Sequence, residues 1–375
     1  MRNADHHILF LATEYDAPGM RPYARTVINT MWQAGDHVLI VSRYGIDSDA
    51  FPGIPADDIT WIDYPTSKLS KAVFRFRPAS VLRAINDIIE RCGIRLVFSL
   101  TEEIILADSI RSLQRQVTLL YTVHDASFHD YQFISPVRWL KNRLLIARPQ
   151  RLMLARTQHQ VTNSATQRED ILQQYPYHRV HYAPFPTLIT DAIANGDMQV
   201  EELRDTDRDY ILFFGTMHLY KGVHLLYEAY RAHPELHDRQ LVIAGSGNIP
   251  FVRHDDESGV IFINRYIDDR ELRDLFQRAA VVVYPYISAT QSGVTSIASY
   301  FGQPMVLSDL PFFKETCGSC DDVTFFASGD SDALADAIEQ ALQAHTDTAT
   351  LYQRQYSQQA LRSALDQAIN ATIQS

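Results

Sequence analysis

Short apolar runs alternate with amphipathic stretches through the first half of the chain. Residues 21–34 and 165–174 have the three-to-four-residue spacing of helices. The apolar runs are strand-length and apolar on both faces, as expected for strands buried in a parallel sheet. They are HILFLAT (7–13), HVLIVS (37–42), LVFSL (96–100), VTLLYTV (117–123), HQVTNS (159–164) and RVHYAP (179–184). This pattern predicts a parallel sheet covered by helices on both sides.

The same rhythm restarts in the second half. Strand-like runs are YILFFG (210–215), QLVIAG (240–245), VIFIN (260–264), VVVYPY (281–286) and PMVLS (304–308). Helical spacing covers residues 223–232, 268–279, 293–301, 331–344 and 351–373. Alternation of this kind predicts an α/β protein of two doubly wound, Rossmann-like domains.

A change in composition marks the boundary between these halves. Pro184 and Pro186 lead into a polar, acidic stretch that ends at Asp209. We therefore predict domains over residues 1–186 and 187–355, followed by a helix over 356–375 that packs back on the first domain. The length of 375 residues suits two domains of about 150–200 residues each.

Composition is that of a folded enzyme in a reducing compartment. Hydrophobic residues make up 46% and charged residues 21% of the chain. The three cysteines are too few for a disulfide framework, and the C-x-x-C pair Cys317 and Cys320 lacks the partners of a zinc site. No apolar run approaches the ~18 residues that span a bilayer, and the N-terminus does not resemble a signal peptide. We expect a cytoplasmic protein.

The negative charge is unevenly distributed. The formal charge is −11, yet the chain through Tyr182 holds 21 Lys and Arg against 18 Asp and Glu. The acidic whole argues against a nucleic-acid partner. The slightly basic first half is compatible with an anionic membrane surface.

Ligands of doubly wound sheets bind beyond the carboxyl ends of the strands, so the loops there are the candidates for chemistry. The loop 214–222 has glycines at both ends and places Lys221 just before a helix, where an ammonium and free N–H groups suit a diphosphate. The loop 288–295 gathers hydroxyl and amide side chains at a helix start. The turn 244–248, with Gly245 and Gly247, is short and suits the floor of a base pocket. Each loop alone also fits an ordinary turn or helix cap.

The order and spacing of these loops together resemble the donor domain of family-4 glycosyltransferases, which are retaining enzymes of the GT-B architecture. The motifs are FFGTMHLYKGVHLLYEAY, LVIAGSGN, the helix DDRELRDLF and PYISATQSGVTSIASYFGQPMVLSD. The likeness covers residues 210–344 and extends more faintly to HILFLATEY, the Gly19 loop and YTVHDASF. It implies two Rossmann-like domains facing across a cleft, the first binding the acceptor and the second a nucleotide-sugar donor.

The resemblance also implies roles for individual residues. Lys221 would neutralise the donor diphosphate, and His124 would lie near the reacting sugar. Gly19, Met20 and Asp125 would lie on the acceptor side. The remaining donor contacts would come from Gly215, Thr216, Arg265, Tyr266, Ile267, Gln291, Ser292, Gly293, Val294 and Thr295. The donor is a substrate, and we expect neither a metal ion nor another cofactor.

Three positions depart from the family's pattern. Thr216 stands where an arginine is usual, and Ala289 and Ile297 stand where two glutamates are often found. An isoleucine cannot accept hydrogen bonds from ribose hydroxyls. The main hypothesis is a hexosyltransferase acting on a glycan or lipid-linked acceptor in cell-surface polysaccharide assembly. A catalytically degenerate nucleotide-sugar-binding partner of another transferase and a GT-B nucleotide-sugar epimerase are the alternatives.

Two stretches combine cations with apolar side chains, Lys68–Arg77 and Pro136–Arg156. Such stretches can lie on anionic lipid, each cation contributing ~1 kcal/mol. They fit equally well an amphipathic helix with its basic face in water. We therefore keep a peripheral position on the inner face of the membrane as an open expectation.

Overall fold

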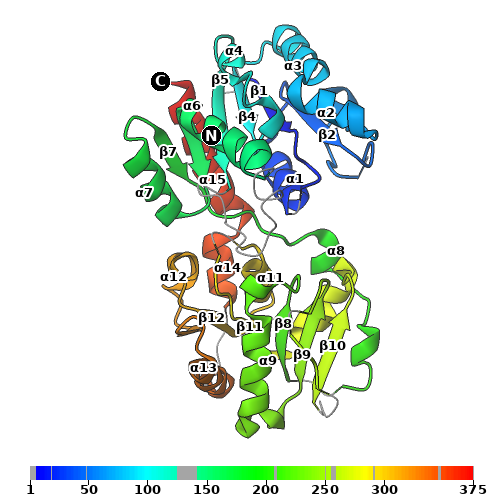
Figure 1. The fold of residues 1–375 in the computed structure, drawn as a ribbon, viewed down its shortest axis with the longest axis vertical. Coiled ribbons are helices and arrows are strands. Elements are labelled where there is room, and N and C mark those ends of the chain that lie inside the picture. Colours follow the sequence, from blue (N-terminus) through cyan, green and yellow to red (C-terminus); the bar gives the residue numbers. More distant parts are fainter. Residues whose placement is uncertain are drawn as a thin grey trace. The chain divides into compact units, whose positions relative to one another are not determined.

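In the computed structural model the chain forms two compact α/β units (Figure 1). The described residues are 6–17, 19–47, 49–124, 142–206, 209–249, 251–254, 259–289, 292–344 and 348–374. The first unit comprises Met1–Pro186 and Gln358–Ser375, and the second comprises Thr187–Ser357. No described helix is long and apolar enough to cross a membrane.

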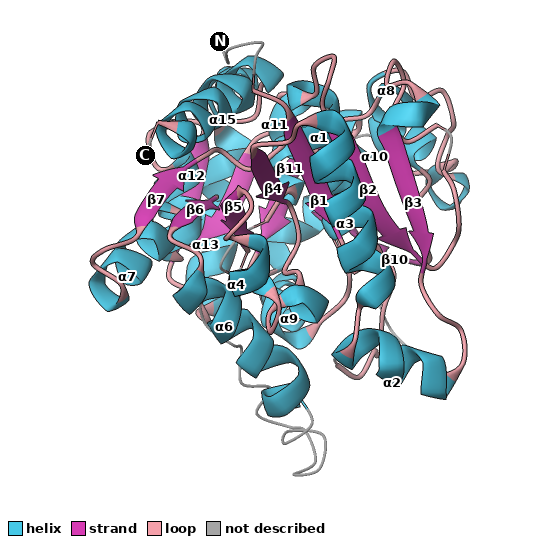
Figure 2. Cartoon of the chain, turned by 90° about the horizontal axis from the view of Figure 1, so that it is seen from above, coloured by secondary structure: helices cyan, strands magenta, loops and turns pink. Residues whose placement is uncertain are grey.

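The first unit contains a seven-stranded parallel sheet with the order β3-β2-β1-β4-β5-β6-β7, so that β3 and β7 lie at its edges (Figure 2). Its strands are β1 (Ile8–Ala12), β2 (His37–Ser42), β3 (Ile59–Asp63), β4 (Leu96–Ser99), β5 (Thr118–Val123), β6 (His159–Thr162) and β7 (Arg179–Tyr182). Its helices are α1 (Met20–Met31), α2 (Lys68–Phe76), α3 (Ala79–Cys92), α4 (Ile110–Leu113), α6 (Arg148–Arg156), α7 (Ala165–Gln174) and α15 (Gln358–Ile373), with a π-helical turn at Arg143–Ala147.

Alternate side chains of β1 enter two different cores. Ile8 and Phe10 pack with buried residues of α1 and α15. Leu9 and Leu11 pack on the opposite face with buried residues of α3, α4 and α6. Because successive side chains of a strand point to opposite faces, a run that is apolar throughout must be covered on both sides.

The second unit contains a six-stranded parallel sheet with the order β10-β9-β8-β11-β12-β13. Its strands are β8 (Tyr210–Phe214), β9 (Leu241–Gly245), β10 (Val260–Asn264), β11 (Ala279–Tyr284), β12 (Met305–Ser308) and β13 (Val323–Phe326). Its helices are α8 (Asp191–Ala194), α9 (Val223–Ala232), α10 (Leu272–Gln277), α11 (Val294–Tyr300), α12 (Pro311–Cys317), α13 (Ser331–Gln343) and α14 (Ala349–Gln355). The predicted α/β class with two doubly wound domains is confirmed.

The chain differs from the sequence-based expectation at its C-terminal end. We expected one helix over 351–373, but the structure forms α14 and α15, which are separated at Tyr356 and Ser357. Tyr356 is buried in the second unit, where its hydroxyl lies 2.7 Å from Oγ1 of Thr295. Leu365 and Ile369 are buried in the first unit. The helical periodicity is continuous over residues 351–373, although α14 belongs to the second unit and α15 to the first.

Candidate active site

The strand order of the second sheet reverses beside β8. The loop after β8 and the loop after β11 both leave the carboxyl ends of these neighbouring strands. Such a reversal is the usual ligand position in doubly wound sheets, because the two connections diverge there. The predicted loop 214–222 and the described parts of the predicted loop 288–295, residues 288–289 and 292–295, lie at this position.

Lys221 is the main charged group at this point of the second unit. It ends the 3₁₀ turn Leu219–Lys221 and is only 8% exposed. Its Nζ lies 5.1 Å from the centre of the Tyr286 ring. Among the described residues, no carboxylate forms a salt bridge with Lys221. A buried ammonium in this setting is a strong candidate for binding an anionic ligand.

The protonation of Lys221 reflects two opposing effects. Burial acts to lower the pKa of its ammonium, but the neighbouring hydroxyl groups of Tyr286 and Tyr220 outweigh burial, and the pKa lies above its usual value. The side chain therefore carries its positive charge at neutral pH. The sequence motifs did not identify Tyr286 as part of this site. Its position directly after β11 is the one signal that could have indicated it.

Glycines hold the two loops in close backbone contact. Gly222 has φ +66°, and a Cβ there would lie 1.7 Å from the carbonyl oxygen of Pro285. A Cβ on Gly215 would lie 3.2 Å from Nζ of Lys221. The amide of Ile287 donates to the carbonyl oxygen of Tyr220 at 2.8 Å. These contacts fix the loop after β8 against the loop after β11.

The start of α11 presents its backbone more than its side chains. Gly293 precedes the helix, and its carbonyl accepts a hydrogen bond from Oγ of Ser296 at 2.6 Å. Thr295 is fully buried and contacts Tyr356, so its side chain faces the interior. Ser292 and Val294 lie at the helix start, whereas the predicted residue Gln291 lies outside the described residues. Backbone N–H groups at the start of α11 remain the candidate hydrogen-bond donors to a phosphate.

The predicted base-binding segment follows the edge strand β10. The guanidinium of Arg265 is held by two carboxylates, 2.7 Å from Glu202 and 2.7 Å from Glu271. Ile267 is buried, while Tyr266 is 74% exposed. Arg265 is therefore committed to ion pairs within the protein. Any contact with a base from this segment is left to the Tyr266 ring or to the backbone.

The structure also shows where the three departures from the family's pattern lie. Thr216 is exposed directly after Gly215, beside the buried Met217. Ile297 is 2% exposed within α11. This apolar, buried side chain offers no group to a ribose, and Ala289 has no polar side chain either.

In the first unit, the predicted residues lie at the carboxyl ends of β1 and β5. Gly19 has φ +79° and precedes Met20, the first residue of α1. His124 follows β5 and is 3% exposed. Its Nε2 lies 2.9 Å from the carbonyl oxygen of Leu100, and Tyr23 packs edge-on against its ring with centroids 4.6 Å apart. Asp125 lies outside the described residues.

A buried carboxyl group connects the loops after β1 and β4, and the sequence motifs gave no sign of it. Glu103 is fully buried and has φ +47°, a conformation that non-glycine residues rarely adopt. Its carboxyl accepts from the amide of Thr13 at 3.2 Å and from the hydroxyl of Thr101 at 2.7 Å. The hydroxyl of Thr101 in turn accepts from the amide of Glu14 at 3.1 Å. This network fixes the start of the loop that leads to Gly19.

Among the described residues, no group of three or more His, Cys, Asp or Glu side chains could hold a metal ion.

Comparison with known proteins finds a family match in the second half of the chain. Residues 208–344 match the model of the family described as glycosyl transferases group 1. The sequence matches none of the curated proteins.

Three solved structures share the fold along nearly the whole chain. Sucrose-phosphate synthase from Thermosynechococcus elongatus is 17% identical, with a TM-score of 0.68 over 98% of this chain and 99% of that one. HepE of Anabaena in complex with UDP-glucose is 15% identical, with a TM-score of 0.65 over 97% and 99%. WaaG, a glycosyltransferase involved in lipopolysaccharide biosynthesis, is 15% identical, with a TM-score of 0.58 over 97% and 98%. The fold is that of the GT-B glycosyltransferases, and residues 208–344 carry a glycosyl transferases group 1 domain.

The close approach at Gly222 generates the first prediction. Gly222→Ala should destabilise the second unit by about 1–2 kcal/mol from its positive φ and a further 1–3 kcal/mol from the clash with Pro285. Gly329→Ala is the matched control, since Gly329 has φ +88° in the same unit but nothing within 4 Å of its Cβ. Chemical denaturation measures both. Equal losses in the two variants would contradict a close contact at Gly222.

The buried Glu103 generates the second prediction. Burial raises the pKa of its carboxyl to about 7, against hydrogen bonds from Thr13 and Thr101 that lower it, whereas the unfolded chain releases the proton near 4.5. The unfolded state therefore loses its proton first. The contribution of Glu103 to stability is complete below pH 4.5 and falls by about 3 kcal/mol as the pH rises to 7.

Glu103→Gln removes this titration. The free energy of unfolding of the wild type, relative to Glu103→Gln, should fall between pH 4.5 and 7 and then stay level. The exposed Glu90 on α3 provides the control Glu90→Gln, for which no such fall is expected. A difference between wild type and Glu103→Gln that is independent of pH would show that the pKa of this carboxyl is not raised in the native protein.

Proposed function

We propose that this chain is a retaining glycosyltransferase that moves a hexose from a nucleoside diphosphate sugar to a glycan or lipid-linked acceptor. The observation that carries the proposal is the buried ammonium of Lys221 at the reversal of strand order, with no carboxylate among the described residues to pair with it. A diphosphate supplies the missing negative charge.

The reaction breaks the bond between the anomeric carbon and the diphosphate oxygen. Negative charge grows on the leaving phosphate, and fixed positive charge and N–H dipoles lower the barrier by meeting it. Lys221 would provide the charge, and the backbone of Ser292, Gly293 and Val294 would provide the dipoles. A phosphate oxygen of the leaving group accepts the acceptor's proton as the acceptor oxygen bonds to the anomeric carbon on the same face. No metal ion is part of this proposal.

Uridine is the first donor base to test. HepE, which shares the fold, has been solved with UDP and with UDP-glucose. The exposed ring of Tyr266 and the backbone beside it are the groups we assign to the base, because the guanidinium of Arg265 is engaged by Glu202 and Glu271. The role of WaaG in lipopolysaccharide biosynthesis supports a setting in cell-surface polysaccharide assembly.

A catalytically degenerate nucleotide-sugar-binding protein is the competing function. The buried Ile297 and the absence of a fixed cation at Thr216 favour it. The two functions share the donor site and differ in turnover. Release of nucleoside diphosphate from the sugar donor by the purified protein supports the transferase, and binding without any release supports the competitor.

The third prediction tests the donor site. UDP, GDP and ADP are compared by thermal shift, since a ligand at 100 times its Kd stabilises the fold by about 2.7 kcal/mol. One nucleotide should stabilise the wild type, and Lys221→Met should lose that response. Lys314→Met is the matched control, because Lys314 also lies over an aromatic ring in the second unit, 4.0 Å from the centre of Phe325, but is exposed. A response retained in Lys221→Met would remove the main support for this site.

We further propose that α2 binds an anionic membrane surface. Leu69, Val73 and Phe76 are 77%, 54% and 70% exposed, and their spacing places them on one side of the helix. The exposed cations Lys71 and Arg77 lie in the same segment. The other basic stretch gives weaker support: Arg148 pairs with Asp108, Arg156 donates to the carbonyl oxygen of Ala107, and residues 136–141 lie outside the described residues.

The fourth prediction follows from the exposed apolar side chains of α2. The wild type should float with phosphatidylglycerol vesicles at low salt, and Leu69→Ser with Phe76→Ser should weaken partitioning at least about tenfold. Val252→Ser in the second unit is the control, since Val252 is 83% exposed. Absence of flotation, or equal flotation of the double variant, would exclude α2 as a membrane-binding element.

A further inference from the structure

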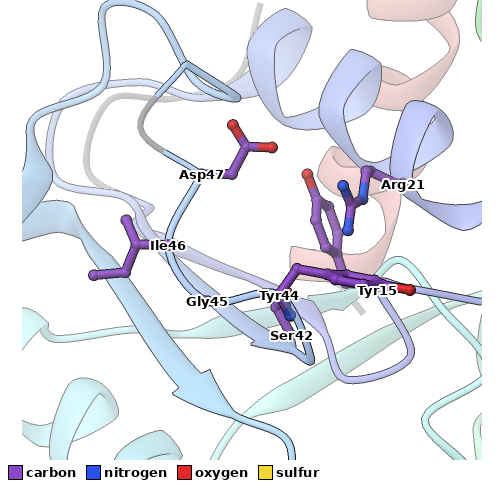
Figure 3. Close-up of a pocket in the computed structure, with 7 residues that line it drawn as sticks. All are labelled: Tyr15, Arg21, Ser42, Tyr44, Gly45, Ile46 and Asp47. Carbon is purple, nitrogen blue, oxygen red and sulfur yellow. Dashed lines mark hydrogen bonds between the residues drawn. The ribbon is translucent and has the colours of Figure 1, made fainter.

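A small pocket in the first unit lies outside the site described above. It opens at the carboxyl ends of β1 and β2 and has a volume of about 230 Å³ (Figure 3). Its lining includes Tyr15, Arg21, Ser42, Tyr44, Gly45 and Asp47. Gly19 and Met20, which we assigned to the acceptor side, lie between Tyr15 and Arg21 in the chain.

The guanidinium of Arg21 is fixed in this pocket. It forms an ion pair with Asp16. Its central carbon atom, Cζ, lies 5.3 Å from the ring centre of Tyr15 and 5.2 Å from that of Tyr44. Asp16 is held in turn, because its carboxylate also accepts from the hydroxyl of Ser42 at 3.2 Å. A donor that is already immobilised loses little entropy when it binds a ligand.

The pocket also offers acceptor groups. The carboxylate of Asp47 pairs with Arg25, and Nε of Arg25 donates to the hydroxyl of Tyr15 at 2.8 Å. Figure 3 shows Asp47, Tyr15 and Arg21 around the same space. A ligand here meets a fixed donor and a fixed carboxylate together.

This combination selects among ligand chemistries. A sugar hydroxyl both donates and accepts, so it can satisfy Arg21 and Asp47 at once. A phosphate or carboxylate group only accepts when ionised, so it cannot donate to Asp47. Arg21 is already paired with Asp16 and therefore offers such a group no unbalanced positive charge. Tyr44 is 77% exposed, and its ring offers an apolar face to the C–H groups of a sugar ring. Gly45, with φ +77° and nothing within 4 Å of its Cβ position, leaves the space beside this ring open.

The volume of the pocket also favours a sugar as the ligand. Pockets for drug-sized ligands have volumes of about 300–1,000 Å³. The volume of about 230 Å³ found here suits one sugar ring better than a nucleotide sugar or a longer glycan.

We propose that this pocket binds one uncharged sugar ring of the acceptor. The ring stacks on Tyr44, and its hydroxyls accept from Arg21 and donate to Asp47. The proposal rests on the proposed transferase function, since it names the chemistry of the acceptor in the first unit. An anionic sugar is the excluded class.

The fifth prediction tests this pocket by saturation-transfer NMR on the full-length protein. The neutral probes are the methyl glycosides of glucose, galactose, mannose and N-acetylglucosamine, and the anionic probe is glucose 6-phosphate. At least one neutral glycoside should bind, and more tightly than glucose 6-phosphate. Tyr44→Ala and Asp47→Asn should each weaken its binding by about tenfold, which corresponds to the loss of one good contact.

Tyr177→Ala is the matched control, because Tyr177 is an 87% exposed tyrosine of the same unit that does not line the pocket. Its glycoside binding should equal that of the wild type. The proposal is overturned if no neutral glycoside binds, if glucose 6-phosphate binds most tightly, or if Tyr44→Ala and Tyr177→Ala behave alike.

The nucleotide response in the same samples separates this proposal from the donor site. Tyr44→Ala should keep the thermal shift that Lys221→Met loses. Nucleotide binding that depends on Lys221, without any glycoside binding, would overturn the pocket and leave the donor site standing. Glycoside binding that depends on Tyr44, without any nucleotide response, would support a carbohydrate site and contradict the transferase function.

Discussion

Both candidate sites depend on the order of the strands within the parallel sheets. The donor site lies where this order reverses between β8 and β11, and the pocket around Arg21 lies beside the reversal between β1 and β4, at the carboxyl ends of β1 and β2. In the first unit the chain leaves β1 for α1 on one face and leaves β4 for α4 on the other, as the two separate cores show. The two connections therefore diverge at the carboxyl ends of neighbouring strands and leave their loops exposed to a ligand. In the second unit the same reversal lies between β8 and β11, where glycines allow the two loops to touch.

The two units differ in the charges that they hold at the carboxyl ends of these strands. The second unit buries a positive charge beside Tyr286 and leaves it without a carboxylate in the described part of the chain. The first unit pairs its charges, with Arg21 against Asp16 and Arg25 against Asp47. An unbalanced cation attracts an anion, whereas balanced donors and acceptors suit a ligand made of hydroxyl groups. This charge arrangement supports our proposals of a phosphate-bearing donor in the second unit and a sugar in the first.

The sequence predicted the interior strands of both sheets but only two of the four edge strands, β7 and β10. Runs such as VVVYPY are buried on both faces and are therefore apolar throughout, which makes them easy to identify. The edge strands β3 and β13 were not identified, because partial exposure allows polar residues such as Thr60 and Thr324 within them. The loop bearing Lys221 could be found because its glycines and lysine are adjacent in the chain.

The partners of the site residues could not be found in this way. Glu202 holds Arg265 from 63 positions away, and Glu103 binds the amide of Thr13 from 90 positions away. No local pattern encodes such contacts, and they decide which side chains remain available to a ligand. The pocket around Arg21 has the same origin, since Ser42 and Asp47 reach it from the next strand of the sheet.

Hydrogen–deuterium exchange with and without a nucleoside diphosphate tests the central claim most directly. Binding at the reversal of the second sheet predicts slower exchange of the backbone amides in residues 213–222 and 286–296, where the two loops and the start of α11 lie. The residues after β1 and β2 in the first unit should exchange at unchanged rates. Protection confined to the first unit, or none at all at saturating nucleotide, would contradict the account.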